Sequence, residues 1–175
     1  TQYTSSAASD VYKRQTIRNQ TEVLLRHIDE YQYDLVIGSS MGGLAAANAS
    51  SLREKSDFKL LLIAPAFGLS DSWENLRDEE LDSWERMGVR RYRGFDLEID
   101  LGWDFMEDAR EMSWPTIRHR TTIIHGSKDD IVPLEVSQTV SEDSELVNLI
   151  VIDDGHRMKR SLSYLSDVAS SLVSS

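Results

Sequence analysis

Residues 33–50 read YDLVIGSSMGGLAAANAS, and this stretch decides the predicted fold. Residues 35–37 form a short apolar run of the kind found in buried strands. The alanine-rich residues 44–49 are typical of a helix that packs closely against a sheet. Between them, residues 38–42 fit the pattern G-x-S-x-G. At a strand-to-helix junction this pattern predicts a nucleophile elbow, a sharp turn that exposes its central serine.

Ser40 is the predicted nucleophile, because it occupies the central position of the pattern, whereas Ser39 comes one residue too early. We expect Gly38 and Gly42 to lie where a side chain would collide with the neighbouring strand or helix. The turn should place a helix N-terminus beneath the serine, so the backbone N–H of Met41 is the predicted oxyanion donor. A phosphate loop is the alternative, but the Lys of a Walker-type loop does not follow these glycines.

A serine nucleophile needs a base that is held by an acid, and alpha/beta hydrolases place them in the order serine, acid, histidine. His27 precedes Ser40, and His119 lies in a polar connection. His125 ends a predicted strand, with no suitable acid between it and Ser40. His156, on the loop after the last predicted strand, is therefore the predicted base.

The acid is expected on the loop HGSKDDIVP, residues 125–133. The pattern His-Gly-x-x-Asp-x-x-Val-Pro selects Asp129, and Asp130 is expected to face solvent or the next helix. Ordinary turn chemistry is the alternative for both residues, since Asp favours turns and helix caps. Three strand-end loops that each supply one member of a triad, in the required order, favour a hydrolase.

Strand and helix patterns alternate along the chain from residue 16 onward. The predicted strands are residues 33–38, 59–67, 120–126 and 146–153, and the predicted helices are residues 16–32, 41–54, 133–142 and 156–173. This alternation predicts an α/β fold with about four parallel strands, right-handed crossovers and helices on both faces. Residues 66–113 interrupt it, and their acidic, Trp-containing part predicts a helical insert with one apolar side.

The composition of the chain argues against several classes of partner and ligand. The formal net charge of −11 argues against a nucleic-acid partner, because phosphate backbones are bound through clustered Lys and Arg. The chain has no cysteine, and its histidines show no His-x-x-x-His spacing for a metal. No apolar run reaches the roughly 20 residues that a membrane span needs. We expect a cytoplasmic domain without metal, cofactor or membrane partner; its oligomeric state is not indicated.

Residues 1–15, TQYTSSAASDVYKRQ, are polar and show no apolar period. Two interpretations are open. One is a disordered leader. The other is that the segment is not native, because SAASDVYKRQ resembles translated adapter read-through in assembled environmental sequences. In either case we place the domain at residues 16–175.

The chain resembles the small alpha/beta-hydrolase esterases of the YqiA type over residues 16 to about 165. The resemblance rests on GSSMGG, LLIAPAF, TTIIHGSKDDIVP, DDGHRM and the Trp-rich insert through FMEDAREM. It implies Ser40 as nucleophile, Asp129 as acid and His156 as base, with esters of short acyl chains as substrates. It also implies that residues 66–113 form a lid that shapes the acyl pocket.

Members of that family begin with a strand ending in a His-Gly-Phe-type turn, which donates the second oxyanion N–H. No His-Gly pair occurs before Ser40 in this chain. The resemblance therefore implies a partial fold with its first strands missing and an activity impaired by truncation. Residues 33–38 would then form an exposed apolar edge prone to aggregation. Loss of one oxyanion donor would lower the rate roughly 10²–10³-fold.

The sequence as a whole predicts a serine hydrolase that cleaves small ester substrates through an acyl-enzyme intermediate. Two alternatives stay open. A thioesterase or acyltransferase would use the same triad on another acyl donor or acceptor. A non-catalytic protein of the same fold would bind a ligand or partner, and its Ser40 would not react with an activated phosphonate.

Overall fold

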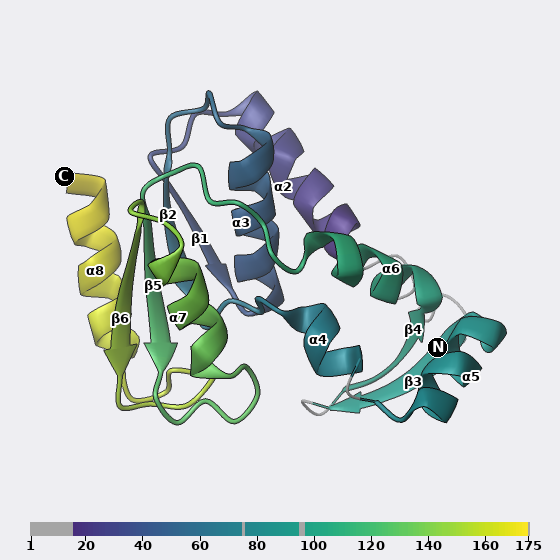
Figure 1. Cartoon of the computed structure of the whole chain (residues 1–175). Coiled ribbons are helices and arrows are strands. Elements are labelled where there is room, and N and C mark those ends of the chain that lie inside the picture. The colour runs from purple at the N-terminus through teal and green to yellow at the C-terminus, as the bar shows by residue number, and fades with distance from the viewer. Residues whose placement is uncertain (1–15, 75, 95–96, 175) are drawn as a thin grey trace, which may run out of the picture. The chain divides into compact units, whose positions relative to one another are not determined.

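The computed structural model describes residues 16–74, 76–94 and 97–174 (Figure 1). The prediction made for residues 1–15 lies outside them. The described chain divides into two compact units, one containing residues 16–20 and Gly68–Ser113, the other containing Thr21–Phe67 and residues 114–174. None of the described helices is long and apolar enough to cross a membrane.

The second unit contains a four-stranded parallel sheet with the strand order β1-β2-β5-β6. The strands are β1 (Leu35–Ser39), β2 (Lys59–Ile63), β5 (Thr121–Gly126) and β6 (Val147–Ile152). This confirms the predicted α/β class and its four parallel strands. Because the strands are parallel, β1, β5 and β6 all end at the same edge of the sheet, where their following loops can meet (Figure 1).

The core of this unit lies around the two central strands. All of β5 is buried, and Leu60, Leu61 and Leu62 of β2 are at most 1% exposed, as expected for strands covered on both faces. At the end of the sheet, no described strand pairs with the outer side of β1, and Ile37 is 54% exposed. The helices of this unit are α3 (Met41–Leu52), α7 (Leu134–Glu142), α8 (Leu162–Ser174) and, from Thr21 onward, α2 (Ile17–Glu30).

The predicted start of the last helix at residue 156 is wrong, because α8 begins at Leu162. Residues 153–161 form a loop in which Met158 has a positive φ of 48°. The backbone N–H of Arg160 and the hydroxyl of Ser161 donate to the carboxylate of Asp154 (2.8 and 2.9 Å). These bonds hold the chain in a loop where the apolar pattern alone predicted a helix.

The insert is not purely helical, which corrects the prediction for residues 66–113. It contains a two-stranded antiparallel hairpin among its helices, in the order α4 (Leu69–Glu74), α5 (Asp78–Met87), β3 (Val89–Gly94), β4 (Leu97–Gly102) and α6 (Trp103–Met112). Opposite charges pair across the hairpin, with Arg91 Nε 3.1 Å from Asp100 Oδ1 and Arg93 Nη2 2.8 Å from Glu98 Oε1. Such cross-strand pairs stabilise a hairpin.

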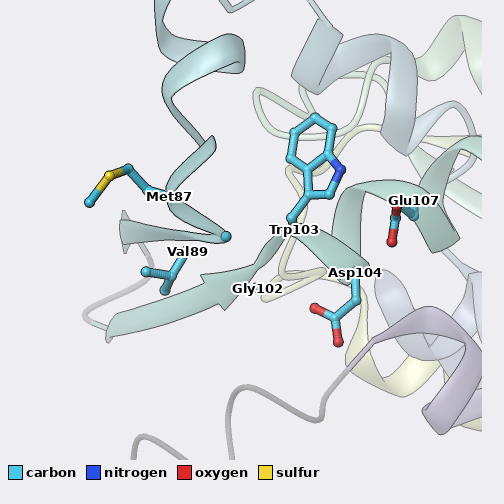
Figure 2. Close-up of a pocket in the computed structure, with 7 residues that line it drawn as sticks. Met87, Val89, Gly102, Trp103, Asp104 and Glu107 are labelled. Carbon is cyan, nitrogen blue, oxygen red and sulfur yellow. The ribbon is translucent and has the colours of Figure 1, made fainter. Parts of the chain in front are cut away.

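Aromatic side chains form the centre of the insert. The ring of Trp73 lies 5.4 Å from Trp84, 5.5 Å from Tyr92 and 5.8 Å from Phe105. Trp84 is 2% exposed, and its indole N–H donates to the carbonyl of Leu101 (3.1 Å). A pocket beside Trp103 is lined by residues of α5, the hairpin and α6, and by none of the predicted catalytic residues (Figure 2). That the insert acts as a lid stays a prediction.

Candidate active site

Ser40 stands at the junction of β1 and α3, as the elbow pattern predicted. Its backbone has φ 52° and ψ −120°, a strained conformation that L residues rarely adopt. Three backbone hydrogen bonds hold it there. Its N–H donates to Ile63 (2.9 Å), and its carbonyl accepts from Leu44 (3.1 Å) and Ala66 (3.0 Å). The turn leaves Ser40 partly exposed at the carboxyl edge of the sheet.

Glycine is required at Gly38, where a Cβ would lie 2.4 Å from the carbonyl oxygen of Gly42. The expected collision at Gly42 itself is wrong, since a Cβ there would meet nothing within 4 Å. The tight position is instead Gly43, where a Cβ would lie 3.0 Å from Cβ of Pro65. The close approach therefore lies one residue later than the pattern suggested, where α3 passes the loop after β2.

The structure brings Ser40, Asp129 and His156 together. His156 Nε2 lies 3.1 Å from Ser40 Oγ, and His156 Nδ1 lies 2.8 Å from Asp129 Oδ2. A carboxylate can only accept, so Nδ1 carries the proton and Nε2 accepts from the serine hydroxyl. The side chain of Asp129 is fully buried, and that of His156 is 9% exposed. The predicted nucleophile, base and acid thus lie within hydrogen-bond reach, in the order that acyl transfer would require.

The loop of residues 125–133, called the acid loop below, carries two neighbouring carboxylates with different surroundings, those of Asp129 and Asp130. Asp129 Oδ1 accepts from the backbone N–H groups of Ile131 and Val132, at 2.9 Å each. Asp130 is exposed, as expected from the sequence. The backbone of the loop thus fixes the carboxylate of Asp129 beside His156.

Asp154 organises the loop that carries His156, and the sequence analysis missed it. Besides its bonds to Arg160 and Ser161, it accepts from the N–H of Gly155 (2.8 Å). Burial opposes its ionised form, but the hydrogen bonds from these three residues prevail and leave the pKa of Asp154 below its ordinary value. The signal in the sequence was an Asp-Gly pair directly before the predicted base.

Backbone hydrogen bonds join the acid loop to the loop of residues 153–161, called the histidine loop below. The N–H of Ser127 donates to the backbone carbonyl of Ile152 (2.8 Å), and the N–H of Lys128 donates to the backbone carbonyl of Asp154 (3.0 Å). On the surface, Lys128 Nζ lies 2.5 Å from Asp153 Oδ1. The distance between acid and base is therefore set by the ladder of β5 and β6 and its continuation into the loops.

Met41 is the first residue of α3, so its N–H belongs to the helical turn whose donors have no partner within the helix. That position agrees with the predicted oxyanion donor, whose role stays a prediction. Among the other histidines, His27 is exposed on α2 and His119 is buried away from Ser40, before β5. Within the described ranges, no group of three or more His, Asp or Glu side chains is placed to hold a metal ion.

The fold is that of the alpha/beta hydrolases. The chain belongs to an uncharacterised protein family, UPF0227, whose sequence model matches residues 3–172. This confirms the resemblance to alpha/beta-hydrolase proteins of the YqiA type. None of the curated protein sequences matches the chain significantly.

Solved structures share the fold at low sequence identity. Mouse alpha/beta hydrolase domain-containing protein 10 is 23% identical, with a TM-score of 0.75 over 91% of this chain and 70% of its own. Est1E from Butyrivibrio proteoclasticus is 18% identical, with a TM-score of 0.70 over 93% and 72%. The esterase EaEST from Exiguobacterium antarcticum is 17% identical, with a TM-score of 0.60 over 91% and 74%.

Proposed function

We propose that the chain is a serine hydrolase that cleaves small esters. The proposal rests on one observation: three loops place Ser40 Oγ, both ring nitrogens of His156 and the buried carboxylate of Asp129 in a continuous hydrogen-bonded line of 3.1 and 2.8 Å. Esterases among the proteins that share the fold add support.

In the proposed reaction, Ser40 Oγ attacks the ester carbonyl while its proton moves to His156 Nε2. Asp129 stabilises the resulting imidazolium through Nδ1, and the N–H of Met41 donates to the developing oxyanion. The protonated His156 then gives its proton to the departing alcohol, which leaves an acyl group on Ser40. Water, deprotonated by His156, attacks that acyl group and releases the acid and the free serine.

Hydrolysis of p-nitrophenyl acetate and butyrate tests this proposal. The wild-type chain should release p-nitrophenol and Ser40→Ala should not. The matched variant Ser39→Ala should retain activity because Ser39 is not the central serine of the elbow. Activity that survives in Ser40→Ala would refute the mechanism. An added alcohol or thiol that diverts the acyl group from water would identify an acyltransferase instead.

A further inference from the structure

His125, the penultimate residue of β5, is a second imidazole beside the acid. It is fully buried, and both of its ring nitrogens have partners. Nδ1 lies 2.7 Å from the hydroxyl of Ser137, which is itself fully buried on α7. Nε2 lies 3.0 Å from the carbonyl of Val132 and 3.3 Å from Asp129 Oδ2.

These contacts define the proton positions on His125. The carbonyl and the carboxylate near Nε2 can only accept, so Nε2 carries the proton. Nδ1 is then an acceptor and receives the hydroxyl proton of Ser137. With the other tautomer, two lone pairs would face each other at Nε2, and the buried carbonyl of Val132 would lose its donor.

His125 fixes Asp129 in two ways. Its Nε2–H holds the carbonyl of Val132, while the N–H of Val132 donates to Asp129 Oδ1 (2.9 Å). The same Nε2–H faces Asp129 Oδ2, the oxygen that accepts from His156 Nδ1. Burial lowers the pKa of His125, against the opposing effects of its bond to Val132 and of the Asp129 charge, so the neutral ring adds a dipole and no competing cation.

We propose that His125 is a positioning residue for the triad: held in one tautomer by Ser137, it fixes the loop and the carboxylate of Asp129 that hold His156. This inference rests on the proposed function. It adds two residues to the three that react: Ser137 on α7 orients His125, and His125 orients Asp129.

The key comparison is between His125→Leu and His125→Gln. Leucine fills the space without a donor, whereas glutamine can place an amide N–H near the position of Nε2. His125→Leu should lower kcat about 10- to 100-fold with KM changed less than about threefold, since a buried donor to a charged group is lost. His125→Gln should recover most of the loss, and Ser137→Ala should show a smaller loss than His125→Leu.

His119 supplies a matched control. It is also buried, with Nδ1 2.7 Å from the hydroxyl of Ser50 and Nε2 2.7 Å from the carbonyl of Ser56, but it precedes β5 at the other end of the sheet. His119→Leu therefore measures the effect of losing a buried imidazole alone. In His125→Leu, kcat should fall with little change in KM and be regained in His125→Gln, whereas His119→Leu should leave kcat within about threefold of wild type.

Two readouts separate this inference from the proposed function. Nitrogen-15 shifts of the wild-type ring should show the Nε2–H tautomer of His125, whether or not the chain is an enzyme, and an Nδ1–H tautomer would overturn the inference. If wild-type Ser40 reacts with a fluorophosphonate and His125→Leu reacts at the same rate, the inference fails alone. If wild-type Ser40 does not react, the proposed function fails.

Discussion

Both ends of the parallel sheet carry a buried histidine bonded to a serine hydroxyl, but only the carboxyl end forms a candidate site. At the amino end, Ser50 is fully buried, and the ring of His119 stacks on Phe58 with 4.0 Å between centroids and 13° between planes. A hydroxyl in that position cannot meet a substrate. The pair therefore joins α3 to the segments that precede β2 and β5.

At the carboxyl end the same chemical groups are arranged differently. Ser40 is partly exposed on a strained turn, and a buried carboxylate, that of Asp129, stands beside both His125 and His156. The comparison teaches that a serine–histidine pair indicates no function by itself. Exposure of the hydroxyl and a carboxylate behind the imidazole make the difference.

The largest effect is expected for Ser40→Ala, a loss on the order of 10⁶ in kcat, as for removal of the nucleophile from other triads. Ser50→Ala should leave kcat within about twofold but lower the free energy of unfolding by about 1–3 kcal/mol, because buried Nδ1 of His119 loses its donor. Ester kinetics and urea unfolding of both variants test the comparison. Similar kinetics in the two variants would contradict it.

Asp129→Asn should lower kcat about 10⁴-fold, because an amide can donate to His156 Nδ1 and so favour the wrong tautomer. Asp130→Asn, on the neighbouring exposed residue, should stay within about twofold of wild type. The same ester assay compares them. A larger loss at Asp130 than at Asp129 would mean that the His-Gly-x-x-Asp pattern has been assigned to the wrong carboxylate.

The sequence was sufficient to predict the sheet, and to predict three residues that the structure brings together at its carboxyl edge, because both depend on local patterns. The elbow needs glycine where the backbone closes at Gly38, and parallel strands need the unbroken apolar runs of β2 and β5. Each predicted triad residue follows a strand end, where loop chemistry is visible in a few letters.

The parts that were missed depend on specific side-chain contacts that no periodic pattern in the sequence shows. The hairpin of β3 and β4 is stabilised by pairs such as Arg91 with Asp100, which no local period reveals. His125 was set aside as the base because of its order in the chain. Its contact with Ser137, on a helix 12 residues later, could not be read from the sequence. The late start of α8 follows from the hydrogen bonds of Asp154, which compete with the helix for backbone donors.

A smaller effect is expected at the histidine loop. Asp154→Asn should lower kcat about tenfold, because the amide cannot accept every donor that now holds the loop. Since the pKa of Asp154 is lowered in the fold, its contribution to stability is present above the unfolded value and is lost as pH falls through the lower folded value. Wild type should therefore lose more stability than Asp154→Asn as pH falls below about 4.

The neighbouring residue is the control for that loop. Asp153 has a side chain that is 65% exposed, and its contact with Lys128 lies on the surface. Asp153→Asn should change kcat less than about threefold, since exposed ion pairs contribute little. Urea unfolding between pH 3 and 6 and ester kinetics at neutral pH measure both variants; an equal loss of kcat in the two would show that the carboxylate of Asp154 has no special role.

The smallest effect is the pH dependence of stability due to His125. Burial lowers its pKa, so the folded state binds the proton less readily than the unfolded chain. Its contribution is fully present above the unfolded value of about 6.5 and is lost as pH falls through the lower folded value. In urea titrations, the difference in free energy of unfolding between wild type and His125→Gln should become smaller from pH 7.5 toward pH 5. A difference that grows would contradict the claim that the buried ring of His125 is neutral.

Mass spectrometry after exposure to a fluorophosphonate tests the central claim most directly. The intact wild-type chain should gain one adduct, peptide mapping should place it on Ser40, and Ser40→Ala should gain none while Ser39→Ala still reacts. An adduct on Ser39, or a folded wild-type chain that gains no adduct at all, would contradict the assignment of Ser40 as an activated nucleophile.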